Sequence, residues 1–274
     1  MTKIIDLKKY NDLLTKLKID CENCSGLCCV ALYSMKTDGF PENKKAGKPC
    51  KNLMLDFRCA IHPQLVQAKM KGCLGYHCFG AGQMVTGLYY PDTNWRTKPQ
   101  KADEIFTTFL TAFQLHQMLW YLIQALSAVE DENLIADIEA LILKNEQLTR
   151  KLPNELLNIE VENYRLKVNE ILKKVIAKTT NSPISDHENK DFLGKNFKGT
   201  NLDGKDFSMA LLIAANFEGC SLIGANFLGA DMRDANIKNT DLTKAMFLTQ
   251  MQINTAKGNA NTKLPPNICR PIFW

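Results

Sequence analysis

Large apolar residues recur at every fifth position along the C-terminal part of the chain. The series consists of Phe192, Phe197, Leu202, Phe207, Leu212, Phe217, Leu222, Phe227, Met232, Ile237, Leu242 and Phe247. Two positions before each of them, the later repeats carry a small residue, which is most often alanine. A helix period of about 3.6 residues or a strand period of about 2 cannot place every fifth residue on one face. We therefore predict a square coil with one repeat on each side and with the large and small residues pointing inward.

A short polar residue stands between the small and the large residue at most steps, as at Asn216 and Asn226. This arrangement resembles the pentapeptide-repeat family. The resemblance implies that four repeats make one coil of a right-handed quadrilateral β-helix, and that residues 190–250 form about three coils. Residues 251–274 lose the period, and we expect them to form a C-terminal cap on the last coil.

Four residues of the repeats need a separate interpretation. Lys190, Lys195 and Lys205 stand where small residues are expected. We interpret the first coil as a polar end cap, because the ends of a solenoid must be shielded. Cys220 occupies a small inward position, and we interpret it as a core residue and not as a ligand.

Apolar stripes at helical spacing run through residues 102–180. They predict helices over Ala102–Val129, Glu132–Lys151 and Asn154–Lys178, with Asn154 as the N-cap after Pro153. Helices joined by such short links favour a small antiparallel bundle.

Several shorter features complete the organisation. His116 falls on the first helical stripe, which favours a hydrogen-bonded core histidine over a metal ligand. Residues 181–189 are polar and are interpreted as a linker. At the start of the chain, Ile4–Leu17 is predicted to be a helix, and the glycine-containing stretch 79–85 a structural turn.

Eight of the ten cysteines are concentrated near the N-terminus. They are Cys21, Cys24, Cys28, Cys29, Cys50, Cys59, Cys73 and Cys78. Gly26 allows the chain to turn sharply within the first four, so that several sulfurs can converge. A Cys-x-x-Cys turn aims two sulfurs at a point about 2.3 Å away, which suits tetrahedral zinc and iron–sulfur sites. His62 and His77 lie near the later cysteines and are further candidates.

The cysteine layout resembles the CxxCxxCC family of zinc- or iron-chelating proteins over about residues 20 to 80. In the downstream half, the resemblance matches Cys50 with Leu53, Cys59 with Ile61, and Cys73. The sequence departs from the family pattern in four ways. An additional residue precedes Cys28, His62 replaces a tyrosine, the spacing to Cys73 is longer, and Cys78 is extra. These departures leave the metal and the exact ligand set open.

A metal site explains the cysteines better than their burial as small apolar residues does. Residues 33–52 contain many Lys, Gly and Pro and few large apolar side chains, so their core would be thin. Zinc bound to thiolates supplies about 10 to 16 kcal/mol of folding free energy, which is enough to organise such a segment. We predict zinc, with an iron–sulfur cluster or copper(I) as alternatives, either in two tetrahedral sites or as one cluster.

Charge and localisation narrow the function classes. The net charge of +5 comes from the first 100 residues, with 15 Lys and Arg against 8 Asp and Glu. The repeats are balanced, which disfavours nucleic-acid mimicry and protection of DNA gyrase. No export signal or membrane span is predicted, so we expect a cytoplasmic protein without disulfides and without a membrane partner.

Together, these observations predict an α+β multidomain protein. Its expected parts are a cysteine-rich metal-binding head over 1–101, a helical bundle over 102–180, the linker, the β-helix and the cap. No hydrolase triad, HExxH, Walker loop or dinucleotide fingerprint is present, so catalysis is not favoured. The predicted function is a metal-binding protein whose β-helix faces bind a protein partner. An iron–sulfur or thiol-redox enzyme or sensor is the alternative, and protection of DNA gyrase is the third hypothesis. The oligomeric state stays open.

Overall fold

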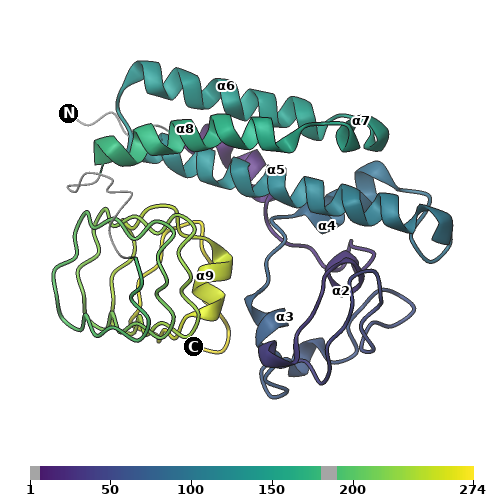
Figure 1. Cartoon of the computed structure of the whole chain (residues 1–274), viewed down its shortest axis with the longest axis horizontal. Helices are drawn as coiled ribbons and strands as arrows, with labels where there is room; N and C mark the ends of the chain where they lie inside the picture. Colours follow the sequence, from purple (N-terminus) through teal and green to yellow (C-terminus); the bar gives the residue numbers. More distant parts are fainter. Residues whose placement is uncertain (1–6, 180–189) are drawn as a thin grey trace. The chain divides into compact units, whose positions relative to one another are not determined.

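The computed structural model describes residues 7–179 and 190–274, and the chain divides into two compact units (Figure 1). One unit contains the described residues before Gln124 together with Ile135–Glu170. The other contains Gln124–Leu134 and Ile171–Trp274. The boundary between the units passes through long helices, and the five-part division predicted above stays a prediction. The predicted linker 181–189 lies outside the described residues.

Long amphipathic helices form the middle of the chain. They are α5 (Ala102–Ala128), α6 (Glu132–Thr149) and α8 (Val161–Thr179), with the short α7 (Pro153–Leu157) before α8. The buried amide of Asn145 on α6 donates to the Leu115 carbonyl of α5 at 2.9 Å and to the Tyr164 hydroxyl of α8 at 3.2 Å. The three helices therefore pack together through a shared polar contact as well as through apolar stripes.

The predicted helix Asn154–Lys178 is wrong in its first part. Pro153 is the first residue of α7 and Leu152 is its N-cap, so Asn154 lies inside the helix. The Asn158 amide then donates to the Asn154 carbonyl at 2.9 Å, and the chain starts a new helix at Val161. Proline is well tolerated at the first helical position because it has no N–H to satisfy there.

Short helical segments and loops make up the N-terminal part. They are η1 (Leu7–Tyr10), α1 (Asn11–Lys16), α2 (Leu27–Ala31), η2 (Lys36–Asp38), η3 (His62–Gln64), α3 (Lys71–Gly75), α4 (Ala81–Met84), η4 (Val85–Tyr89) and η5 (Pro99–Lys101). Their core is apolar and continues onto α5, where Leu27 and Val30 of α2 join Val85, Ile105 and Phe109. His116 is a hydrogen-bonded core residue as predicted, with Nδ1 2.6 Å from the Phe79 carbonyl.

The described repeats, 190–247, form a coil that closes every twenty residues; we call this segment the repeat coil. Asn196 forms a parallel bridge with Asn216, and Asn216 forms one with Asn236. The apolar residues from Phe207 to Phe247 in the five-residue series are buried, as predicted. Aromatic rings one coil apart stack, with Phe197 and Phe217 centroids 5.1 Å apart. Cys220 is buried and its Sγ donates to the Phe197 carbonyl at 2.9 Å, so it is a core residue.

The predicted α+β class with a right-handed quadrilateral β-helix is wrong. Over residues 7–179 and 190–274 the structure has no β-strand and no sheet, and its regular secondary structure is helical. Each pentapeptide contributes one isolated bridge and one two-residue turn. A strand needs consecutive bridged residues, and a corner after every bridged residue prevents such a run. The repeat coil is therefore a stack of turns.

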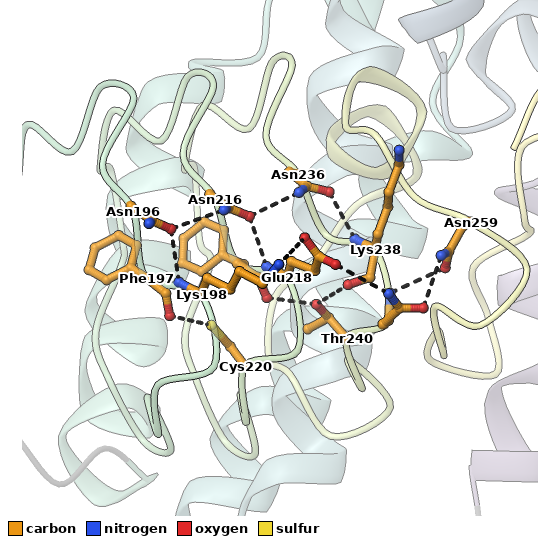
Figure 2. Close-up of polar contacts among 12 residues, drawn as sticks. Asn196, Phe197, Lys198, Asn216, Glu218, Cys220, Asn236, Lys238, Thr240 and Asn259 are labelled. Atoms are coloured by element: carbon orange, nitrogen blue, oxygen red, sulfur yellow. Dashed lines mark hydrogen bonds and ion pairs between the residues drawn. The ribbon is translucent and has the colours of Figure 1, made fainter.

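Polar side chains on one side of the repeat coil form a ladder between successive turns (Figure 2). The Asn216 amide donates to Asn196 Oδ1 at 2.9 Å, and the Asn236 amide donates to Asn216 Oδ1 at 2.9 Å. Next to the ladder, Lys198 Nζ lies 3.1 Å from Glu218 Oε2. These contacts fix the register of the turns, because each amide meets its own equivalent one turn away.

Both ends of the repeats are structured by specific contacts. Lys190 Nζ lies 3.0 Å from Asp206 Oδ2 and donates to the Ser208 carbonyl at 2.9 Å, so this lysine is committed to contacts within the coil. After the last repeat, α9 (Gln250–Thr255) turns the chain, and Lys257 forms a parallel bridge with Asn236. The tail thus continues the pairing of the last turn.

In the described residues, no helix has both the length and the apolarity required to cross a membrane.

Candidate metal centre in the cysteine-rich segment

The cysteine-rich segment encloses a cavity of about 610 Å³, which we call the cysteine cavity. All eight cysteines that were predicted as ligands line it: Cys21, Cys24, Cys28, Cys29, Cys50, Cys59, Cys73 and Cys78. His62 also lines the cavity, whereas His77 does not. Instead, Nδ1 of His77 accepts a hydrogen bond from the Phe79 backbone N–H at 3.2 Å. Residues up to 57 positions apart along the chain thus face one space.

Helix α2 brings the first cysteines to the cavity. Its N-cap, Gly26, has a φ of +69°, and a Cβ there would lie 2.8 Å from Leu53 Cδ1. The positive φ favours glycine here, and a side chain would also push the end of Leu53 away. The turn places Cys28 and Cys29 side by side at the start of α2, with their sulfurs 3.9 Å apart.

The loop after residue 49 adds Cys50 and Cys59. The Cys50 N–H donates to the Cys29 carbonyl at 2.9 Å, which anchors the loop on α2. Leu53 and Cys59 then form an antiparallel bridge, so the loop folds back on itself. Cys50 and Cys59 are held in this way on the side of the cavity where Cys29 lies.

The glycine-containing stretch after Cys78 is not a simple turn as predicted, because it starts helix α4. Gly80 is its N-cap with a φ of +75°, and a Cβ on Gly80 would lie 2.0 Å from the Lys16 carbonyl oxygen. A Cβ on Gly82 would lie 2.7 Å from Cys24 Sγ and 3.8 Å from Cys78 Sγ. The missing side chain at Gly82 lets both sulfurs approach the helix backbone.

Nearby backbone N–H groups offset part of the effect of burial on the pKa values of two thiols. Burial raises the pKa of Cys78, and hydrogen bonds from the N–H groups of Gly82, Gly80 and Ala81 oppose that rise. Burial likewise raises the pKa of Cys24, against hydrogen bonds from the Leu27 and Gly26 N–H groups and from Thr86. Such donors stabilise a thiolate and are common around metal-bound sulfur.

Burial and neighbouring thiols shift the pKa values of Cys21, Cys73, Cys28 and Cys29. Burial raises the pKa of Cys21 to about 11 and that of Cys73 to about 12. The hydrogen bond between Cys28 and Cys29 raises the pKa of Cys28 and lowers that of Cys29. A cation in the cavity would favour the thiolate form of every one of them.

Lys44 supplies positive charge beside the cavity. Its Nζ donates to the Leu32 carbonyl and, at 3.3 Å, to the Val30 carbonyl, which holds the side chain against the end of α2. Burial lowers the pKa of Lys44, and this effect outweighs the charges of Cys50, Cys29 and Cys28, which act to raise the pKa. The sequence indicated a basic excess in this part of the chain, but the hydrogen bonds that single out Lys44 depend on the folded backbone.

The sulfurs do not yet converge on a point. Among the residues that the structure describes, no three Cys, His, Asp or Glu side chains are close enough together to hold a metal ion. The backbone fold places the cysteines around one cavity. Their side chains would have to rotate about χ1 to bring four sulfurs within bonding distance of one metal ion. The donor set consists of thiolates, which suits zinc, copper(I) or iron–sulfur chemistry and not magnesium or calcium.

Comparison with known proteins identifies the repeats and a relative that matches nearly the whole chain. The pentapeptide-repeat family matches residues 194–222 and 210–247, with eight copies of the repeat. Over 271 residues the chain is 41% identical to Uncharacterized protein YybG of Bacillus subtilis (strain 168), covering 97% of each protein. The chain therefore belongs to the same family as Bacillus subtilis YybG, and it carries pentapeptide repeats in its C-terminal region.

Proposed function

We propose that the cysteine-rich segment binds zinc through thiolates of the cysteine cavity, and that the repeat coil is an interaction module for a protein partner. The observation that carries the metal proposal is the gathering of all eight predicted cysteines around one cavity. The segment between Leu32 and Leu65 has no fully buried apolar side chain among its described residues, so its own core is thin. Bound zinc would supply about 10 to 16 kcal/mol of folding free energy.

The proposed role of zinc is structural. Four thiolates leave no open position on a tetrahedral zinc ion, whereas catalytic sites keep one position for water or substrate. The candidate ligands extend from Cys21, which lies before α2, to Cys78, which follows α3, so the metal would hold these short elements and the loops around them together. The repeat coil would then present its side faces, including the asparagine ladder, to a protein.

Metal analysis of the intact protein tests the metal proposal. After anaerobic purification, we expect zinc by elemental analysis and protection of the cavity thiols from alkylation. Cys220→Ser and Cys269→Ser serve as matched controls, because neither cysteine lines the cavity. Both variants should keep the full zinc content. Absence of bound metal with all eight cavity thiols reactive under native conditions would refute the proposal.

The same preparation distinguishes the redox alternative. The close Cys28 and Cys29 sulfurs, 3.9 Å apart, are the observation that favours it. A brown protein with acid-labile sulfide would indicate an iron–sulfur cluster in place of zinc. Formation of a Cys28–Cys29 disulfide under mild oxidation would indicate a redox-active pair.

A further inference from the structure

We propose that Trp95 and Arg96 are positioning residues for the candidate metal centre, which hold the cysteine-bearing loops in place around the cysteine cavity before a metal binds. Neither residue is among those that line the cavity. The inference rests on the proposed zinc binding and goes beyond it by giving a role to two residues outside the set of candidate ligands.

Trp95 and Arg96 lie in a tight turn that is fixed by its own side chains. Asn94 Oδ1 accepts hydrogen bonds from the N–H groups of Arg96 at 2.9 Å and of Thr97 at 3.0 Å. The Asn94 N–H donates to Thr97 Oγ1 at 3.1 Å. An asparagine that binds the backbone N–H two residues further on is a common means of fixing a turn. Trp95 and Arg96 therefore start from an ordered backbone.

Arg96 holds the loop of residues 50–59, which begins and ends with a cavity cysteine. Its guanidinium donates to the Met54 carbonyl at 2.8 Å and to the Leu53 carbonyl at 3.5 Å. Leu53 is also the residue that forms the antiparallel bridge with Cys59. Arginine presents its N–H donors in a planar fork, so one side chain can bind two successive carbonyls.

The Arg96 guanidinium also contacts two aromatic rings. Its Cζ lies 4.7 Å from the centroid of the Phe57 ring and 4.8 Å from that of the Trp95 ring. The two rings meet edge to face, with their centroids 5.8 Å apart. A guanidinium over the face of an aromatic ring is attracted by the electrons of the ring. Phe57 lines the cavity, so this cluster attaches the cavity wall to Trp95.

Trp95 connects the same cluster to the first cysteines. Its side chain is buried and contacts the Phe106 ring of α5, with the centroids 6.2 Å apart. The indole Nε1–H donates at 2.8 Å to the carbonyl of Ser25, which directly follows Cys24. A buried indole N–H needs such an acceptor. Trp95 thus fixes the turn after Cys24 against α5.

Ser25 extends the network to the segment of Cys78. Its N–H donates to Thr86 Oγ1 at 2.9 Å, and Thr86 Oγ1 donates to the Gly82 carbonyl of α4 at 3.0 Å. At the start of α4, the Ala81 N–H donates to the Cys78 carbonyl at 3.0 Å. None of these contacts uses a sulfur atom, so metal coordination does not compete with them. They join three cysteine-bearing segments of the cavity wall.

Such a network raises metal affinity by ordering the ligands in advance. A site whose loops are already ordered does not have to order them when the metal binds. Without the fork and the ring contacts of Arg96, the metal itself would have to order the loop 50–59. Replacing groups that orient metal ligands typically costs about tenfold to a hundredfold in metal affinity.

The zinc affinity of full-length variants tests the role of Arg96. In competition with a chromophoric chelator, Arg96→Gln and Arg96→Lys should both bind zinc about tenfold to a hundredfold more weakly, since lysine keeps the charge but has no planar fork. Arg150→Gln is the control, because it removes an exposed arginine that pairs with Glu146 on its own helix. Its affinity should not change. Unchanged affinity in both Arg96 variants would overturn the inference.

Trp95→Phe tests the other half of the network. Phenylalanine keeps a ring in the core but removes the donor to the Ser25 carbonyl. This variant should also bind zinc more weakly than the unmodified protein. Unchanged affinity would overturn the role of Trp95.

Hydrogen exchange distinguishes positioning from general stabilisation of the fold. In metal-free Arg96→Gln, residues 50–59 should exchange faster than in the unmodified protein, and saturating zinc should restore their protection. Loss of protection over α5 and α6 that zinc does not restore would show that Arg96 supports the fold, and would overturn the inference. If the unmodified protein bound no zinc, the proposed function would fall and the inference with it. Normal zinc binding with unaffected Arg96 and Trp95 variants would overturn the inference alone.

Discussion

At the scale of single residues, the buried His116 makes the stability of the fold depend on pH. Its side chain is 4% exposed, and burial lowers its pKa to about 4 although the Phe79 carbonyl favours the protonated ring. Because a carbonyl oxygen can only accept, Nδ1 carries the proton in this contact. In the unfolded chain an ordinary histidine takes up a second ring proton below a pKa of about 6.5.

The first prediction concerns the pH dependence of stability. The folded pKa lies below the unfolded one, so the contribution of neutral His116 is present above about pH 6.5 and is lost as the pH falls toward 4. Between pH 7.5 and 5.5 the free energy of unfolding should fall by roughly 1 kcal/mol more in the unmodified protein than in His116→Gln. Denaturant titrations at both pH values measure the difference. Equal pH slopes would contradict the prediction, and any acid loss of metal cancels in the comparison.

Gly82 offers a second test at this scale. In Gly82→Ala the new Cβ would meet Cys24 Sγ at 2.7 Å, and the sulfur, at the end of its side chain, would have to move. Helix propensity alone favours alanine by about 1 kcal/mol, so the fold should persist while zinc affinity falls roughly tenfold to a hundredfold. Gly87→Ala is the control, since no heavy atom lies within 4 Å of its Cβ position. Competition with a chromophoric chelator measures both affinities, and unchanged affinity in Gly82→Ala would contradict the prediction.

At the scale of elements, the repeat coil shows how a five-residue period is converted into packing. Leu212 is completely buried, and its neighbour Leu211 is 47% exposed. The two leucines differ in position within the same pentapeptide and not in chemistry. We therefore expect the inward residues to contribute most of the free energy of folding of the coil.

The third prediction uses this adjacent pair. Leu212→Ala should lower the free energy of unfolding of the repeat coil by about 2 to 5 kcal/mol, because it leaves a cavity between stacked turns. Leu211→Ala should change it by no more than about 0.5 kcal/mol. Thermal unfolding followed by circular dichroism compares the two variants. Equal losses would show that burial within the pentapeptide does not set its stability.

The elements also show what the sequence determines and what it leaves open. Twelve apolar residues at five-residue spacing predict the inward positions, because each side of the coil is five residues long. The same period does not distinguish a sheet from a stack of turns, since this depends on how many residues bridge on each side. Pro153 was correctly placed near a helix boundary, but whether it precedes or begins the helix depends on the capping of Leu152.

The sequence predicts which residues belong to the candidate site, but it does not predict how they are arranged around the cavity. The density of cysteines in the sequence singled out the eight cysteines that are among the residues lining the cavity. Their arrangement around the cavity depends on the loop at Leu53 and on Gly82, whose contacts join residues far apart in sequence. No pattern in the sequence identifies Lys44 among the other lysines.

At the scale of the whole molecule, stability is supplied by different means in different parts. Large apolar side chains fill the repeat coil and the interfaces of α5, α6 and α8. Between Leu32 and Leu65, by contrast, the described residues include no fully buried apolar side chain. A bound metal would therefore matter in that stretch and not elsewhere.

The last prediction follows from this contrast and concerns metal removal. Treatment of the purified protein with a strong chelator should increase hydrogen exchange over residues 21–78, because the loops there have few apolar contacts to replace thiolate bonds. Residues 207–247 should keep their protection, since their backbone hydrogen bonds run between stacked turns around buried side chains. Far-ultraviolet circular dichroism should change little, because α2, α3 and α4 are short and the long helices do not contain the cavity cysteines. Exchange mass spectrometry before and after re-addition of zinc separates the outcomes. A uniform increase along the chain would mean that the metal supports the entire fold, and no increase over 21–78 would mean that the segment holds together without it.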